Sequence, residues 1–140
     1  MADFSKALAK VLRREGGYVD DPNDKGGETY KGISRRAHPN SYMWVLIDKY
    51  KKDCGGATNQ FKTKLAKDKT ITNEVNIIYK SKYWNTFKLD LVLSQGLAEQ
   101  IFDDAVNRGC GATCKILCAL FNLPITTKPS AKLFEILKTY

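Results

Sequence analysis

A glutamate near the start of the chain stands where acid–base chemistry is expected. Glu15 precedes Gly16-Gly17, which add no side-chain bulk, so a large substrate could approach its carboxyl group. The residues before Glu15 predict a helix, and the negative end of a helix dipole disfavours an ionised carboxylate. We therefore expect a raised pKa for Glu15. A carboxylic acid that stays protonated can donate a proton to a leaving oxygen, as glycoside hydrolysis requires.

The loop after Glu15 offers several candidates for a second catalytic group. Its carboxylates are those of Asp20, Asp21, Asp24 and Glu28. One of them could activate a water molecule or stabilise developing positive charge. Asp24 is favoured because Gly26-Gly27 can turn its carboxylate toward a cleft, although aspartates in such loops also cap turns. Thr29 adds a hydroxyl that could orient the water.

A mainly helical scaffold is predicted to position these residues. Asp3 can cap a first helix that ends near Glu15, and the turn formers of 18–28 predict an irregular loop or small hairpin. Further helices are predicted over 42–51, 58–67 and 130–138, and after the cap residues Thr72 and Ser94. Another is predicted after Gly109 and Gly111. The expected fold class is mainly α, with at most a small β-hairpin beside a cleft.

Length and composition limit the possible organisations of the chain. With 140 residues, 43% of them hydrophobic, one compact domain over 1–140 is expected. The longest apolar run, 43–47, is far shorter than the roughly 20 residues that span a membrane. Charges throughout the first 14 residues do not suit a secretory signal, so we expect synthesis in the cytoplasm and later release or export.

The net charge of +8 favours an acidic partner without specifying which one. Seven lysines fall between residues 49 and 69, and they fit either a solvated surface or a polyanion-binding face. The acidic loop near Glu15 argues against a nucleic-acid-binding domain, which would bind in a strongly salt-dependent manner. We expect a monomer that binds no nucleic acid.

Three of the four cysteines recur every fourth residue along one predicted helix. Cys110, Cys114 and Cys118 would share a helix face, where neighbours one turn apart rarely meet disulfide geometry. The only histidine is His38, distant from them in sequence. Reduced thiols that pack against the core are therefore expected, and no metal or cofactor is predicted.

Several ordered motifs resemble the glycoside hydrolase 108 family of N-acetylmuramidases, whose members are also known as secretion activator proteins. The motifs are E-G-G-Y at 15–18, D-x-G-G-x-T at 24–29, G-I at 32–33, I-Y-K-S-K-Y-W at 78–84 and F-D-D-A-V-N-R-G at 102–109. The family resembles phage-type lysozymes, so the resemblance implies a lysozyme-like helical domain. The resemblance implies Glu15 as general acid, Asp24 as partner carboxylate and Thr29 as the hydroxyl that positions water.

Four further residues are candidates for substrate contact. Tyr18 lies next to the catalytic segment, and Trp84 could stack on a sugar ring or pack in the core. Asp103 and Asn107 are one helical turn apart, where they could bond each other or N-acetyl groups, or cap the helix. The segment that ends at Gly109 resembles the family's cleft wall.

The C-terminal region departs from the family pattern. Cys118 stands where members commonly have a glutamine, and Leu123-Pro124-Ile125-Thr126-Thr127 replaces a D-G-x-x-G-x-x-T segment. Residues 110–140 are thus expected to be an altered or shortened form of the family's peptidoglycan-binding-like region.

The resemblance implies a hydrolase of bacterial peptidoglycan, an endolysin-like lysozyme that cleaves between N-acetylmuramic acid and N-acetylglucosamine without a cofactor. Two alternatives stay open. A lytic transglycosylase would use one acid and form an anhydro-sugar, and a catalytically silent module would bind glycan on the same scaffold.

Overall fold

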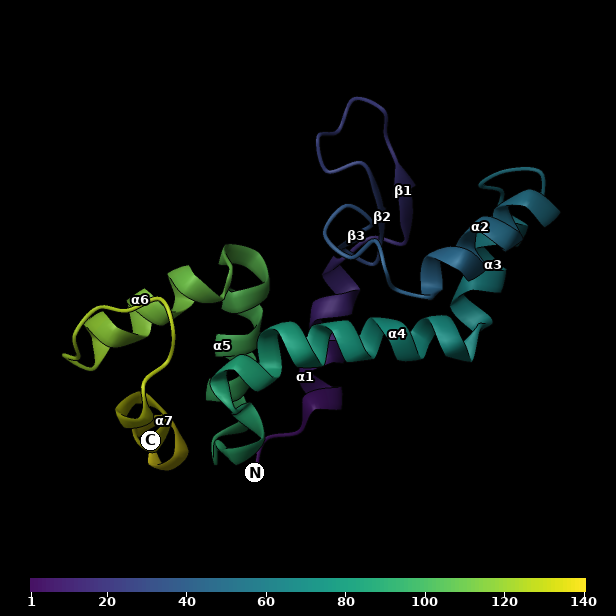
Figure 1. The fold of residues 1–140 in the computed structure, drawn as a ribbon. Coiled ribbons are helices and arrows are strands. Elements are labelled where there is room, and N and C mark those ends of the chain that lie inside the picture. The colour runs from purple at the N-terminus through teal and green to yellow at the C-terminus, as the bar shows by residue number, and fades with distance from the viewer. The chain divides into compact units, whose positions relative to one another are not determined.

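The computed structural model describes residues 1–140, which pack as two compact units. Unit 1 contains residues 1–11 and 79–140, and unit 2 contains residues 12–78. Seven α-helices and one three-stranded antiparallel sheet make up the fold (Figure 1). This composition confirms the predicted mainly α, lysozyme-like class. No helix is long and apolar enough to cross a membrane.

The first helix, α1 (Phe4–Arg14), ends directly before Glu15, as predicted. It begins where the Asp3 carboxylate accepts a hydrogen bond from the Ser5 amide at 2.8 Å. Such a side-chain cap satisfies an amide that has no partner within the helix. Ala7, Leu8 and Val11 form its buried face. The boundary between the two units falls within this helix.

The sheet of unit 2 consists of β1 (Tyr18–Asp20), β2 (Glu28–Tyr30) and β3 (Ile33–Ser34), in that order. Tyr18 pairs with Tyr30, and Thr29 pairs with Ser34. The sequence predicted at most one β-hairpin, and the third strand, β3, was not predicted. Strands β2 and β3 are joined through Lys31 and Gly32, which both have positive φ, as a tight hairpin turn requires. Lysine gives no sequence signal for that conformation.

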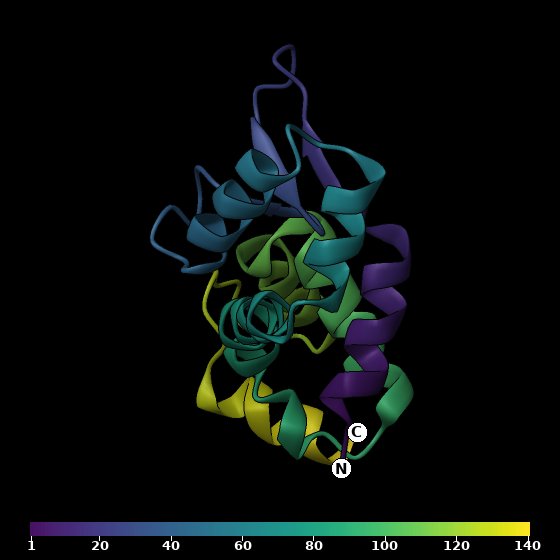
Figure 2. The same ribbon diagram turned by 90° about the vertical axis from the view of Figure 1, so that its right-hand side faces the viewer.

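The remaining helices of unit 2 are α2 (Met43–Asp53), α3 (Asn59–Lys67) and most of α4 (Lys69–Tyr79). Helices α2 and α3 pack against each other and lie side by side in both views (Figures 1 and 2). The prediction that Thr72 caps this helix is wrong, because α4 starts at Lys69, three residues before Thr72. There the Asp68 carboxylate accepts a hydrogen bond from the Ile71 amide at 3.0 Å.

Unit 1 contains the chain's densest group of aromatic side chains. A π-helical turn (Lys80–Trp84) and two 3-10 turns (Asn85–Phe87 and Leu89–Leu91) lead into α5 (Gln95–Arg108). The Phe4, Trp84 and Phe102 rings meet edge to face, with centroids 5.4 to 5.7 Å apart. This geometry is the one that aromatic quadrupoles favour.

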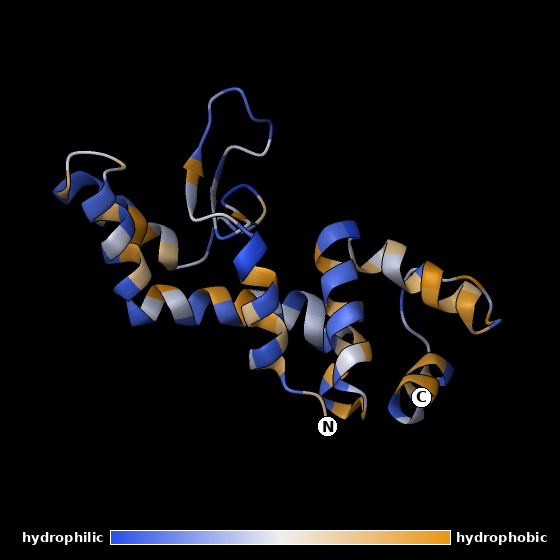
Figure 3. Ribbon diagram, turned by 180° about the vertical axis from the view of Figure 1, so that it is seen from behind, coloured by the Kyte–Doolittle hydropathy of each residue, from blue (hydrophilic) through white to orange (hydrophobic).

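The last two helices are α6 (Cys110–Leu120), which is largely hydrophobic in Figure 3, and α7 (Ala131–Thr139), which carries both hydrophobic and hydrophilic residues. All four cysteines are free thiols, and Cys114 and Cys118 are buried. Both of their sulfurs contact the hydroxyl of Thr126, at 3.9 and 3.7 Å. The prediction of reduced thiols that pack against the core is confirmed for these two residues.

Removing the Asp68 cap should destabilise the fold more than removing the Thr72 hydroxyl. We expect Asp68→Ala to lower the free energy of unfolding by about 1 to 2 kcal/mol, since it deletes the α4 cap. It also deletes the acceptor of the Tyr50 hydroxyl bond, at 2.5 Å. Thr72→Ala, the matched control within the same turn, should cost clearly less. Urea unfolding followed by circular dichroism measures both, and equal losses would contradict the assignment of Asp68 as the cap.

Candidate functional site

Glu15 occupies an open position in unit 2. Its side chain is half-buried, directly after the last residue of α1, and makes no hydrogen bond or ion pair. A Cβ atom added at Gly16 or Gly17 would meet nothing within 4 Å. The backbone after Glu15 is nonetheless held, because the Lys31 amide donates to the Gly17 carbonyl at 3.1 Å. The space beside Gly16 and Gly17 is therefore open, and access of a bulky substrate to Glu15 stays a prediction.

Asp24 lies exposed in the loop between β1 and β2. Its Oδ1 accepts a hydrogen bond from the Gly26 amide at 2.9 Å, and its carbonyl accepts one from the Gly27 amide at 3.1 Å. Asp24 therefore does cap the turn, which was the alternative role considered for it from the sequence. It does not compete with chemistry, because a carboxylate has a second oxygen that can accept a proton.

Thr29 is the central residue of β2, half-buried, between Val19 on one side and Ser34 on the other. Its hydroxyl has no hydrogen-bond partner within the protein. A hydroxyl on a central strand has a well-defined backbone position and is able to bind a water molecule.

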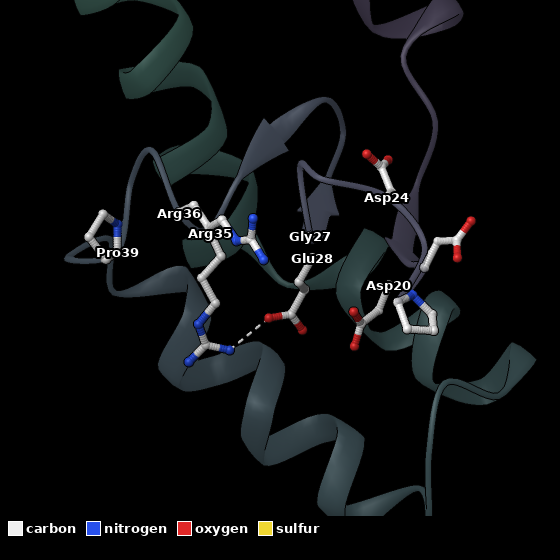
Figure 4. Close-up of a pocket in the computed structure, with 9 residues that line it drawn as sticks. Asp20, Asp24, Gly27, Glu28, Arg35, Arg36 and Pro39 are labelled. Atoms are coloured by element: carbon white, nitrogen blue, oxygen red, sulfur yellow. Dashed lines mark hydrogen bonds and ion pairs between the residues drawn. The ribbon is translucent and has the colours of Figure 1, made fainter.

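An open pocket of about 460 Å³ lies between the β1–β2 loop and the residues after β3. Its lining residues are Asp20, Asp21, Pro22, Asp24, Gly27, Glu28, Arg35, Arg36 and Pro39. Figure 4 shows Asp20 and Asp24 on one side, the arginines and Pro39 on the other, and Glu28 between them. Asp24 is the only predicted catalytic residue in this lining, since Glu15 and Thr29 do not belong to it.

The Glu28 carboxylate is fully engaged by neighbouring side chains. It accepts hydrogen bonds from the Tyr18 hydroxyl and from the Arg35 guanidinium, the latter at 2.8 Å. Arg35 also makes a bidentate pair with Asp48, at 2.7 Å for both bonds. Of the four loop carboxylates, Glu28 is therefore the one that maintains the structure. The sequence analysis did not identify its partner Arg35. No sequence spacing connects Arg35 with Asp48.

Tyr18, a predicted substrate contact, packs in unit 2 with only 7% of its surface exposed. Its ring meets Phe61 edge to face at 5.0 Å. Burial, together with the hydrogen bond to Glu28, raises the pKa of Tyr18 to about 12. The Lys51 ammonium donates to the Tyr18 oxygen at 2.9 Å, and this contact acts in the opposite direction. The structure thus places Tyr18 in the core of unit 2, bonded to Glu28 and Lys51, and substrate contact at Tyr18 stays a prediction.

The other three candidates belong to unit 1. Trp84 is completely buried, and its indole N–H donates to Asp90 at 2.7 Å, so it presents no face on which a sugar could stack. Its core interpretation is correct, and the predicted sugar contact is not supported. Asp103 is half-buried and Asn107 is exposed. Substrate contact at Asp103 and Asn107 stays a prediction.

The chain matches the sequence profile described as glycosyl hydrolase 108 over residues 8–109, well over half its length. It belongs to the glycosyl hydrolase 108 family. Glu15, Asp24 and Thr29 all lie within the matched range, as do the motifs at 78–84 and 102–109. Family membership makes the chain a glycoside hydrolase and supports a substrate in peptidoglycan.

Among solved structures, the chain is similar to SagA from Brucella abortus, with 25% sequence identity and a TM-score of 0.64. The similarity covers 98% of this chain and 69% of that one. No curated protein matches the chain. No three histidine, cysteine or acidic side chains gather where they could hold a metal ion.

The raised pKa of Tyr18 predicts a loss of stability at high pH. A tyrosine whose pKa is near 12 when folded and near 10 when unfolded keeps its proton longer in the folded state. Its contribution to the free energy of unfolding is complete below pH 10 and is lost as the pH rises from 10 to 12. Urea unfolding of the wild type and Tyr18→Phe at pH 9, 10 and 11 should show a steeper decline for the wild type. Parallel curves would contradict this assignment.

Proposed function

We propose that this chain is an N-acetylmuramidase that hydrolyses the β-1,4 bond between N-acetylmuramic acid and N-acetylglucosamine in peptidoglycan. Family membership supports the substrate. The observation that carries the proposal is Glu15, a half-buried carboxyl at an open helix end that makes no ion pair or hydrogen bond. A carboxyl in this setting can donate its proton to a substrate oxygen.

In the proposed reaction, Glu15 donates its proton to the glycosidic oxygen while the bond between that oxygen and the anomeric carbon breaks. A water molecule, oriented by the Thr29 hydroxyl, adds to the anomeric carbon. Asp24 accepts the proton that this water loses, and it stabilises the positive charge that develops on the sugar ring. The products are a new reducing end and a free hydroxyl, and no cofactor takes part.

Hydrolysis is preferred to the two alternatives because the chain retains a second carboxylate and a hydroxyl for water. A lytic transglycosylase needs only the acid, since the muramic acid hydroxyl attacks its own anomeric carbon. A silent glycan-binding module needs none of the three groups. Asp24 at the pocket and Thr29 on the central strand therefore support hydrolysis.

Digestion of purified peptidoglycan by the wild type should yield reducing N-acetylmuramic acid ends, identified by mass spectrometry. Glu15→Gln should lower this activity by at least about 100-fold, because the amide cannot donate an acidic proton. Equal activity of the two proteins would refute the proposal. Anhydro-muramic ends would assign the chain to the transglycosylases.

Replacing the partner groups tests their separate roles. Asp24→Asn should lower kcat by about 100-fold and Thr29→Val by about 10-fold, as expected for a base and for a group that orients water. Asp53→Asn makes the same charge change at an exposed position at the end of α2 and serves as the matched control. Wild-type kcat for both site variants, with Glu15→Gln inactive, would indicate that Glu15 acts without them.

We further propose that the protein is made in the cytoplasm and reaches the wall by later release or export. The proposed substrate lies outside the cytoplasmic membrane, so a protein made in the cytoplasm has to cross that membrane to act on it. Fractionation of producing cells before lysis tests the route. Protein already in the periplasm or medium would contradict release at lysis and favour dedicated export.

A further inference from the structure

The loop that carries Asp24, residues 21–27, is stabilised mainly by bonds within itself. The Asn23 amide donates to the Asp21 carboxylate at 2.9 Å, and the Asp24 amide donates to the Asp21 carbonyl at 3.0 Å. The amides of Gly26 and Gly27 donate to Asp24. The loop residues are mostly hydrophilic (Figure 3). These local bonds set the shape of the loop. They do not fix its position relative to the sheet, which depends on other contacts.

Two side chains from outside the loop, Ser34 and Arg36, hold its tip. The Ser34 hydroxyl donates to the Gly26 carbonyl at 3.3 Å. The Arg36 guanidinium donates from Nη1 to the Lys25 carbonyl. A charged donor makes the stronger hydrogen bond of the two. Arg36 is therefore the main connection between residues next to Asp24 and the segment after β3.

Arg36 also packs against the backbone at the end of the loop. A Cβ atom at Gly27 would lie 3.2 Å from Nε and 3.5 Å from Cζ of Arg36. Gly27 has φ +67°, so glycine suits both the conformation and the close approach. Figure 4 shows Arg36 beside Gly27. Gly27 leads directly into β2, which carries Thr29.

We propose that Arg36 is a positioning residue that holds the loop at Lys25 and Gly27 and so keeps the Asp24 carboxylate in place; this inference rests on the function proposed above. The Asp24 side chain is exposed, and its one side-chain bond goes to Gly26 of the same loop. Its location thus follows the location of the loop. A displacement of about 1 Å of a reacting group can cost about 100-fold in rate.

Kinetics on peptidoglycan test the proposal with a control from the same loop. Arg36→Ala should lower kcat by about 10-fold or more, with KM changed less than kcat, because the lost contact acts on a group used in the transition state. Lys25→Ala removes one positive charge and retains the carbonyl that Arg36 binds, so it should stay within about twofold of the wild type. Guanidinium ion at low millimolar concentration should partly restore Arg36→Ala alone.

Amide exchange measured by NMR gives a readout that does not depend on activity. The amides of Gly26 and Gly27 donate to Asp24, so they should exchange several-fold faster in Arg36→Ala and at the wild-type rate in Lys25→Ala. Circular dichroism and the melting temperature should show that unit 2 stays folded in both variants.

The inference is overturned if Arg36→Ala matches Lys25→Ala in either kcat or Gly26 and Gly27 exchange, while Glu15→Gln is inactive. Failure of the proposed function looks different: Glu15→Gln would be as active as the wild type, whatever the exchange rates of Arg36→Ala.

Discussion

The carboxylate of Glu28 is the centre on which the arrangement of unit 2 depends. It lies in β2, accepts from Tyr18 of β1, and pairs with Arg35, which in turn binds Asp48 of α2. Removing one member of such a group leaves partly buried charges without partners, which is costly. The Arg35 guanidinium also lies over the Trp44 ring, 5.4 Å from its centroid. A sheet of only eight residues is thus tied to the helices by side chains.

The same arrangement separates carboxylates that differ in role although they lie close in sequence. Arg35 and Tyr18 engage Glu28, and Arg35 holds the pKa of Asp48 below its usual value through its hydrogen bonds. Asp24 is exposed and bonded to one amide of its own loop, and Glu15 has no partner at all. The carboxylates held by charged partners maintain the fold, whereas the two that the proposed reaction uses have no charged partner. This division is expected where stability and catalysis share a small region.

The loop of residues 21–27 shows how a catalytic group can lie on an irregular segment and still be well placed. Turn bonds to Asp21 and Asp24 shape the loop, and contacts from Ser34 and Arg36 fix its tip. Gly27 permits the close approach of Arg36, because an added Cβ atom would lie only 3.2 Å from Nε of the guanidinium. In unit 1, by contrast, Phe4, Trp84 and Phe102 pack edge to face and stabilise that unit.

The sequence by itself determined the features that depend on neighbours along the chain. The end of α1 at Glu15, the caps at Asp3 and Ser94, and the turn around Asp24 each follow from a few adjacent residues, as does the family assignment from ordered motifs. Only the tertiary structure decided which carboxylates have partners, because Arg35 meets Glu28 across 7 positions and Asp48 across 13. The burial of Trp84 and Tyr18 also became known only from the tertiary structure. A hydrophobic pattern along a helix or strand shows that one face is covered, but it does not specify which other element covers that face.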